Sequence, residues 1–410
     1  MIQCMDSFDR EEIQNGAIFS EETVNTRITD LTVDVNKVGL GLGSDERIMG
    51  VYHNDCDGFE VERVDVWNAT GYAFICQGTD ADTYCLNGTY REDNAYNCQV
   101  AFEQMTADTV LVDNCHARPE TPDGDSDIAI DNYFHPYRGS RNITFRDCSG
   151  VGPGVMANIL GTGGFDDLEN IRFVRTRLHR TGGTGAAVIV TGPAPMNGLS
   201  FEDSEVISAE GPALTMDSNT VGASRGTDWI CSQSISSALV GVLCPTGAIF
   251  KFHGGKVHAT NTHASGSCNA IAANDTCSLV DVDVAASGKA GILPITGTIR
   301  VDELTILRQI DITGAPVETR AGNVRQRGQL TFTTDGSNSY ADIQLTHKTI
   351  NALAVDLQFT VRSAGAGYLG SFGMNWRAID DDTIRVYASM NLGAASHRLC
   401  YDYFEPPYRG

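Results

Sequence analysis

The chain has 410 residues and a formal net charge of −23 at pH 7. Affinity for nucleic acid comes mainly from Lys and Arg that neutralise phosphates, so this acidic chain is not expected to bind nucleic acid. No apolar run approaches the roughly 18 residues of a membrane span, so we expect no membrane span. Met1 to Arg10 is too polar and acidic for a signal peptide, so we expect no recognisable targeting signal.

After a lead-in of residues 1–25, one pattern recurs: apolar, any, apolar, two residues of any type, apolar, any, apolar. The clearest copies are Phe59-Val61-Val64-Val66 and Ile299-Val301-Leu304-Ile306. Further copies begin at Thr26, Val110, Ile171, Leu199 and Cys277, and weaker ones at Tyr84, Ile143, Trp229 and Phe250. Their loose spacing indicates stacked coils joined by loops of variable length.

Alternation places the first two apolar residues of each copy on one strand face, and the two-residue break turns the chain before the next pair points inward. Each unit needs its neighbours to bury that face, as in a solenoid. Apolar third strands follow, as at Gly71–Phe74 and Gly185–Ile189. Three short strands per rung predict an all-β protein whose residues 26–319 form a right-handed parallel β-helix of about ten rungs. A propeller or a sandwich is disfavoured, because two-residue hairpin turns are scarce.

The pattern stops near Thr313, and the polar stretch 320–329 is expected to be a linker. From Leu330 longer alternating segments follow, beginning at Leu330, Ala341, Ala354, Thr383 and Arg398. They predict a small C-terminal β-sandwich over residues 330–410, used for trimerisation or receptor binding.

The rungs over residues 26–313 resemble the pectate-lyase-like β-helix superfamily, with Asn142–Cys148 similar to its usual rung sequence. Residues 343–348 and 383–387 resemble the small β-domains that close viral tail spikes, which implies a homotrimer on a virion. The polygalacturonase motifs of the superfamily are incomplete here: Gly152-Pro153-Gly154 lacks the His of Gly-His-Gly, and no Arg-Ile-Lys follows. We therefore do not transfer that mechanism.

The densest group of polar residues precedes the rung at Ile143. Asp125, Asp127 and His135 are the candidate catalytic residues, because glycoside hydrolysis needs two carboxylates and a lyase needs a base such as His or Tyr. The candidate substrate-binding residues are Asp131, Tyr133, Tyr137, Arg138, His179 and Arg180. A solvated acidic loop is the alternative interpretation of this segment.

No metal site is expected from cysteine, since the 12 Cys form no C-x2-C pair. Cys98, Cys115, Cys148 and Cys277 lie in apolar patterns and are expected in the core, whereas the pairs Cys231/Cys244 and Cys268/Cys277 are spaced for local disulfides. Asp123, Asp125 and Asp127 have the first spacings of a calcium loop, but Ile128 stands where Gly is expected. A Ca²⁺ ion there is an option that the sequence leaves open.

Only five of the 29 basic residues are Lys, and Asp outnumbers Glu about two to one. An Arg- and Asp-rich surface suits a protein that stays soluble in concentrated salt, which favours a halophilic source, a virus of a halophile for instance, over an ordinary acidic secreted or virion protein.

Three functions remain open. The first is a virion tail-spike or fibre-like protein that binds host surface polysaccharide or glycoprotein, assembled as a homotrimer with other virion proteins. The second is a polysaccharide depolymerase, hydrolase or lyase, on the same β-helix. The third is a structural virion component without glycan activity. All three place the protein on a virion or outside the cell, and the fold alone does not choose among them.

Overall fold

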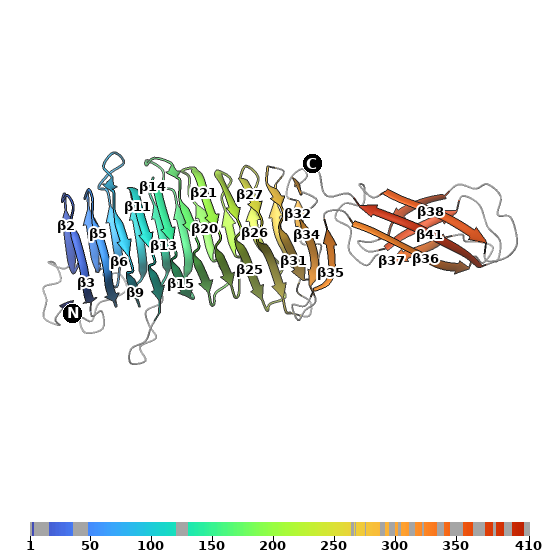
Figure 1. Ribbon diagram of the computed structural model, residues 1–410, viewed down its shortest axis with the longest axis horizontal. Coiled ribbons are helices and arrows are strands. Elements are labelled where there is room, and N and C mark those ends of the chain that lie inside the picture. The colour runs from blue at the N-terminus through green and yellow to red at the C-terminus, as the bar shows by residue number, and fades with distance from the viewer. Residues whose placement is uncertain are drawn as a thin grey trace.

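The computed structural model describes residues 2–3, 16–35, 48–119, 130–263, 266, 268–274, 276–287, 292–294, 300–301, 305–310, 316–321, 324–333, 340–344, 356–363, 374–379, 383–388 and 396–405. The regular elements in this part of the chain are β-strands. Figure 1 shows the strands from β2 to β34 stacked side by side in a long column, coloured from blue to orange. No described helix is long and apolar enough to cross a membrane.

One wall of the column, here called sheet B, contains one strand from each rung, and all its neighbours pair in parallel. Its strands are β2 (Ile18–Glu21), β4 (Val51–Asn54), β6 (Tyr72–Gln77), β10 (Val100–Met105), β13 (Asn132–Tyr137), β16 (Val155–Leu160), β20 (Val188–Thr191), β23 (Leu214–Met216), β26 (Leu239–Cys244), β29 (Cys268–Ala273) and β32 (Ile292–Pro294). Eleven strands in this sheet agree with the expected number of about ten rungs.

The other two strands of each rung belong to a 24-stranded sheet, here called sheet A. Its strands are β1 (Ile2–Gln3), β3 (Arg27–Asp34), β5 (Glu60–Trp67), β7 (Cys85–Leu86), β8 (Thr89–Arg91), β9 (Asn94–Tyr96), β11 (Ala107–Asp113), β12 (His116–Arg118), β14 (Arg141–Arg146), β15 (Ser149–Gly152), β17 (Leu168–Glu169), β18 (Arg172–Val174), β19 (Arg177–Arg180), β21 (Met196–Glu202), β22 (Glu205–Ser208), β24 (Thr220–Arg225), β25 (Asp228–Gln233), β27 (Ile249–His253), β28 (Lys256–Asn261), β30 (Ser278–Val280), β31 (Asp283–Ser287), β33 (Arg300–Val301), β34 (Ile306–Ile310) and β35 (Pro316–Ala321). Val61 pairs with Ile28, 33 residues earlier, whereas Val112 pairs with Tyr90, 22 residues earlier, so the coils stay in register while loop lengths vary. The parallel β-helix is confirmed.

The chain bends within each rung of sheet A at a residue with positive φ. These residues occupy the break in the repeating pattern: Asp30, Arg63, Glu92, Asn114, Asp147, Arg175, Asp203, Gly226, Gly254 and Asp281, with φ from 49° to 64°. Apart from the two glycines, they are polar residues whose side chains point outward or bond locally, which makes this left-handed conformation tolerable. The bend aims the apolar residues on both of its sides at the axis of the column.

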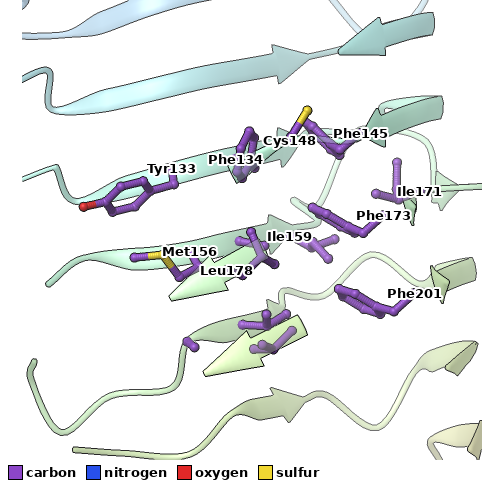
Figure 2. Close-up of a cluster of buried hydrophobic side chains, with 14 of the residues drawn as sticks. Tyr133, Phe134, Phe145, Cys148, Met156, Ile159, Ile171, Phe173, Leu178 and Phe201 are labelled. Atoms are coloured by element: carbon purple, nitrogen blue, oxygen red, sulfur yellow. The ribbon is translucent and has the colours of Figure 1, made fainter. Parts of the chain in front are cut away.

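The interior is filled by stacked side chains from successive rungs. Phe173 lies between Phe145 and Phe201, with ring centroids 4.7 and 4.8 Å away, and Phe102 stacks on Phe74 and Phe134 from sheet B. Figure 2 shows Phe145, Phe173 and Phe201 one above another along sheet A. Cys98, Cys115, Cys148 and Cys277 are buried, as expected. The ten cysteines of the described residues are thiols, including Cys231, Cys244 and Cys268, so the local disulfides are not formed in this structure.

The copy of the pattern at Tyr84 was wrong, because the buried residues in register with Val112 and Ala117 are Tyr90 and Ala95. The copy at Trp229 was also assigned to the wrong strand. That rung begins in β24, where Ser224 pairs with Phe201 on one side and with Phe252 on the other. Ser224 is buried in place of an apolar residue, and its hydroxyl accepts a hydrogen bond from Nε1 of Trp229 (2.9 Å). The polar residue hides the pattern in β24, and Trp229 itself lies in the following strand, β25.

Strands occupy both ends of the segment that was expected to be a linker. β35 pairs antiparallel with β34, and β36 (Val324–Thr333) begins at Val324. At the other end of the column, β1 and β2 pair with β3 and β4, so paired strands precede residue 26.

The C-terminal strands form two antiparallel sheets. One consists of β36, β41 (Ser396–Glu405) and β38 (Asp356–Ser363), and the other of β37 (Tyr340–Gln344), β40 (Thr383–Ala388) and β39 (Met374–Ala378). Five of the six were expected from the sequence, and β39 was not. Ile343, Ile384 and Val386 are buried, so one face of the second sheet is covered, as a sandwich requires.

Candidate functional site

The loop expected to carry the chemistry is only partly described. Asp123, Asp125 and Asp127 lie in the segment 120–129, outside the described residues, so their geometry and the calcium option stay predictions. The strand that follows the loop is β13, which begins just after Asp131 and contains Tyr133, His135 and Tyr137. Three of the predicted site residues therefore lie on β13.

His135 forms a buried pair with Glu103 of the neighbouring strand β10. Nδ1 of His135 lies 2.8 Å from Oε2 of Glu103, and the two residues are in register. Glu103 is 1% and His135 is 8% exposed. Oε1 of Glu103 and Nε2 of His135 have no partner among the described residues. Buried polar groups without full sets of partners are costly, so this pair is a candidate for a functional role.

Strand alternation places the pair on the outer face of sheet B. Phe102 and Phe134 point into the core, so the next residues, Glu103 and His135, point outward. The register continues this outer row through Phe19, Tyr52, Ile75, Glu103 and His135, and a second row through Glu21, Asn54, Gln77, Met105 and Tyr137. We call these ten residues the sheet B face.

The N-terminal part of the sheet B face carries a network of polar groups and aromatic rings. The hydroxyl of Tyr52 lies within hydrogen-bonding distance of Oε1 of Gln77 (3.2 Å) and Oδ1 of Asn54 (3.3 Å). Nδ2 of Asn54 donates to Glu21 (3.2 Å), and Phe19, which is exposed, packs on the Tyr52 ring with centroids 5.1 Å apart. Burial first, and then the Asp55 carboxylate, raise the pKa of Tyr52 to about 12, so its hydroxyl stays protonated.

Two loops add side chains where β13 ends. The Tyr137 ring stacks on the His135 ring at 5.2 Å, and the guanidinium of Arg138 lies over the rings of Tyr137 (4.9 Å) and Phe165 (5.1 Å). Beside Phe165, Asp166 accepts a hydrogen bond from the hydroxyl of Tyr84 at 2.8 Å. The hydrogen bond between Tyr84 and Asp166 joins two loops that are 82 residues apart in the chain.

The outer surface of sheet A differs, because ion pairs between rungs cover it. Arg146 donates to both oxygens of Asp113 (2.8 Å each), and Arg175 does the same to Asp147 (2.7 Å each). The guanidinium of Arg175 lowers the pKa of Asp147. Further pairs join Arg141 to Asp108, Arg172 to Glu202, Arg177 to Glu205 and Lys256 to Asp228. Within each of these pairs the two opposite charges neutralise one another.

The remaining predicted site residues are separated by the fold. Tyr133 is buried, and its hydroxyl donates to the carbonyl of Val151 (3.0 Å), which places it in the core, as Figure 2 shows. Asp131 accepts from Nε2 of Gln99 (3.2 Å) just before β13. His179 bonds to Glu205 (2.7 Å) on sheet A, and Arg180 donates to the carbonyls of Pro153, Gly182 and Ala186. Of the predicted residues, the structure thus brings together His135, Tyr137 and Arg138.

Sequence reasoning missed Glu103, Tyr52 and Gln77. Glu103 is the one charged residue of the strand Val100–Met105, and a charge inside an apolar strand is a usable signal. Its partner His135, 32 residues later, becomes visible only with the register. The described residues include no group of three or more His, Cys, Asp or Glu placed to hold a metal ion.

These features define an elongated, acidic parallel β-helix protein with a polar and aromatic strip along one wall. Its sequence matches no protein-family model and no curated protein. Among solved structures it is similar to the tailspike protein gp49 of Pseudomonas phage LKA1, with 13% identity, a TM-score of 0.45, and coverage of 96% of this chain and 65% of that one.

Two other phage proteins are similar at the same level. The gp54 tailspike of Acinetobacter baumannii bacteriophage AP22, solved in complex with a capsular saccharide, has 10% identity and a TM-score of 0.37, with 99% and 67% of the two chains covered. A tailspike variant of E. coli bacteriophage HK620 has 9% identity and a TM-score of 0.42, with 97% and 83% covered. The parallel β-helix is established by the strand pairing described above, and this chain spans less than two thirds of the LKA1 protein.

Proposed function

We propose that this chain is a virion tail-spike or fibre-like protein that binds a host surface glycan along the sheet B face. The observation that carries the proposal is the contrast between the two walls of the β-helix. Sheet A carries carboxylate–guanidinium pairs, whereas the N-terminal part of the sheet B face exposes, fully or partly, the rings of Phe19 and Tyr52 and the amides of Asn54 and Gln77. Ile75, Glu103, Met105 and His135 of the same face are buried. Sugar rings have apolar faces that stack on aromatic side chains and hydroxyls that bond to amides, so the sheet B face suits a glycan.

An extended repeating surface also fits an extended repeating ligand. Neighbouring rungs place Tyr52, Ile75 and Glu103 in register, at the regular strand spacing of about 4.8 Å. A polysaccharide lying along the column would meet an equivalent position at each rung. The virion location and the homotrimer rest on the sequence resemblance of residues 343–348 and 383–387 to domains that close viral tail spikes.

A second candidate function is cleavage of the same glycan, and the pair of Glu103 and His135 favours it. Glu103 holds Nδ1 of His135, and the other ring nitrogen, Nε2, is buried and has no partner among the described residues, so it is the nitrogen that would exchange a proton. A β-eliminating lyase needs such a base. A hydrolase needs two carboxylates; Glu103 would be one, and Asp125 or Asp127 would supply the other.

The binding test compares variants on the two walls. Tyr52→Leu and Gln77→Ala on the sheet B face should weaken binding to purified host polysaccharide at least several-fold, because stacking and hydrogen bonds are lost. Trp67→Leu is the matched control, since Trp67 is a partly exposed ring on sheet A that stacks on Tyr96 at 4.0 Å. Equal losses in the control, or a parent protein that binds no host glycan, would overturn the proposal.

The same polysaccharide distinguishes binder, lyase and hydrolase. Unsaturated uronate produced by the parent and abolished by His135→Gln would identify a lyase. New reducing ends without unsaturation, abolished by Asp125→Asn or Asp127→Asn while binding persists, would identify a hydrolase. Binding without either product would leave the function as attachment.

A further inference from the structure

Arg138 occupies an unusual place at the end of β13. The backbone turns there through two residues with positive φ, Arg138 (51°) and Gly139 (64°). The peptide N–H of Arg138 donates to the carbonyl of Leu160 (3.1 Å), which fixes the turn against the next rung. A Cβ at position 139 would lie 2.8 Å from the carbonyl oxygen of Asp166, so glycine is required where that loop approaches. The turn that presents Arg138 is therefore tightly constrained.

The side chain of Arg138 is oriented but has no partner for its charge among the residues that the structure describes. Its guanidinium lies over two rings, Tyr137 at 4.9 Å and Phe165 at 5.1 Å. Within the described residues it makes no ion pair and no side-chain hydrogen bond. Arg141, Arg146 and Arg175 differ, because each bonds to an aspartate of a neighbouring rung. Rings that contact the plane of a guanidinium leave its N–H groups directed outward for a ligand.

We propose that Arg138 is the carboxylate-binding subsite of the sheet B face, so that the glycan contains an acidic sugar such as a uronic acid residue. The inference rests on the proposed glycan-binding function. A planar guanidinium binds a carboxylate through two parallel hydrogen bonds, and the stacked rings hold it in position before the ligand arrives. A chain of net charge −23 repels anions overall, so an acidic polymer needs such a local cation to bind.

The surroundings of Arg138 fit this role. Nearby Asp166 already accepts the Tyr84 hydroxyl, and nearby Arg141 already bonds to Asp108. Burial first, and then the hydrogen bond to Asp166, raise the pKa of Tyr84 to about 12, so the phenol remains a donor. Tyr137 connects Arg138 to His135 on the sheet B face through stacked rings. An acidic sugar at Arg138 would thus lie at the edge of the same surface.

The test uses the host polysaccharide and the same polymer after chemical reduction of its carboxyl groups. Arg138→Gln should lower affinity for the acidic polymer about ten- to hundredfold, the usual range for hydrogen bonds to a charged group, and should leave affinity for the reduced polymer unchanged. Arg138→Lys keeps the charge without the planar fork and should lose less. Arg172→Gln, which breaks an exposed pair with Glu202 on sheet A, is the control for the change in net charge.

The outcomes separate the two proposals. A parent that binds both polymers equally, or an Arg138→Gln variant as tight as the parent, overturns the carboxylate subsite but leaves glycan binding in place. Equal losses for Arg138→Gln and Arg172→Gln would assign the effect to net charge and overturn the subsite as well. A parent that binds neither polymer removes both proposals.

Discussion

Asp93 is an acidic residue buried in the interior of the β-helix. Its side chain is fully buried beside the bend of its rung, and its oxygens accept hydrogen bonds from the backbone N–H groups of Val64 (2.8 Å) and Arg91 (3.1 Å). Burial outweighs these bonds and raises the pKa of Asp93 to about 8. At neutral pH the carboxyl group is therefore protonated in the folded protein and ionised in the unfolded chain.

The sign of the pH dependence follows from these two states. The folded pKa lies above the unfolded value of about 3.9, so the contribution of Asp93 to stability is complete below that value and is lost as the pH rises toward 8. From pH 5 to 8 the loss is about 1.4 kcal/mol per pH unit, or about 4 kcal/mol. His53 acts oppositely, because burial lowers its pKa to about 4 and its contribution is lost as the pH falls from about 6.5. The two effects nearly cancel below pH 6.5, so stability should be level there and should decline above it.

Urea unfolding of the parent and of Asp93→Asn, at pH 5 to 8 and constant ionic strength, measures the effect. The difference in unfolding free energy between the two proteins should shrink by about 1.4 kcal/mol per pH unit, since the other titrating groups are common to both and cancel. In His53→Gln the decline should begin already near pH 5. A parent-to-variant difference that stays constant across the range would mean that Asp93 is ionised in the folded protein, and the reasoning would be refuted.

Three further predictions concern packing, assembly and salt. Phe173→Ala should lower the free energy of unfolding by about 3–5 kcal/mol, measured by thermal or urea unfolding, because it opens a cavity between Phe145 and Phe201. Arg175→Ala, which removes an exposed ion pair, should lower it by less than about 1 kcal/mol. Comparable losses for the two variants would contradict the assigned core. The full chain should be a trimer in light scattering and a 1–320 truncation should not, since the C-terminal domain is too small for a large core of its own; a full-length monomer at micromolar concentration would end this idea. The melting temperature should rise between tenth-molar and molar salt as self-repulsion is screened, and a flat or falling value would remove the interpretation as a halophilic protein.

The fold could be predicted because the β-helix repeats a local rule. Each rung places apolar residues on both sides of a two-residue break, and one residue of that break takes positive φ, as Arg63 and Asn114 do. Such a rule is readable without knowing which strands are neighbours. It failed where Ser224 replaced an apolar residue, because a serine hydroxyl satisfied inside the core by Trp229 looks the same in the sequence as one exposed to solvent.

The site depends on register, which loop lengths determine and composition does not reveal. His135 was identified because it follows an acidic loop, but the side chain it contacts, Glu103, lies 32 residues earlier and has no acidic neighbours in its strand. The contact of Arg138 with Phe165 likewise requires the next rung to place its loop over β13. Rungs here differ in length by 12 residues between the extremes, since Val61 pairs with a residue 33 positions earlier and Ile292 with one 21 positions earlier. A change of one residue in a strand's register would turn Glu103 from the outer face into the core, so the chemistry of this wall is fixed by the stacking of the whole column and not by any one segment.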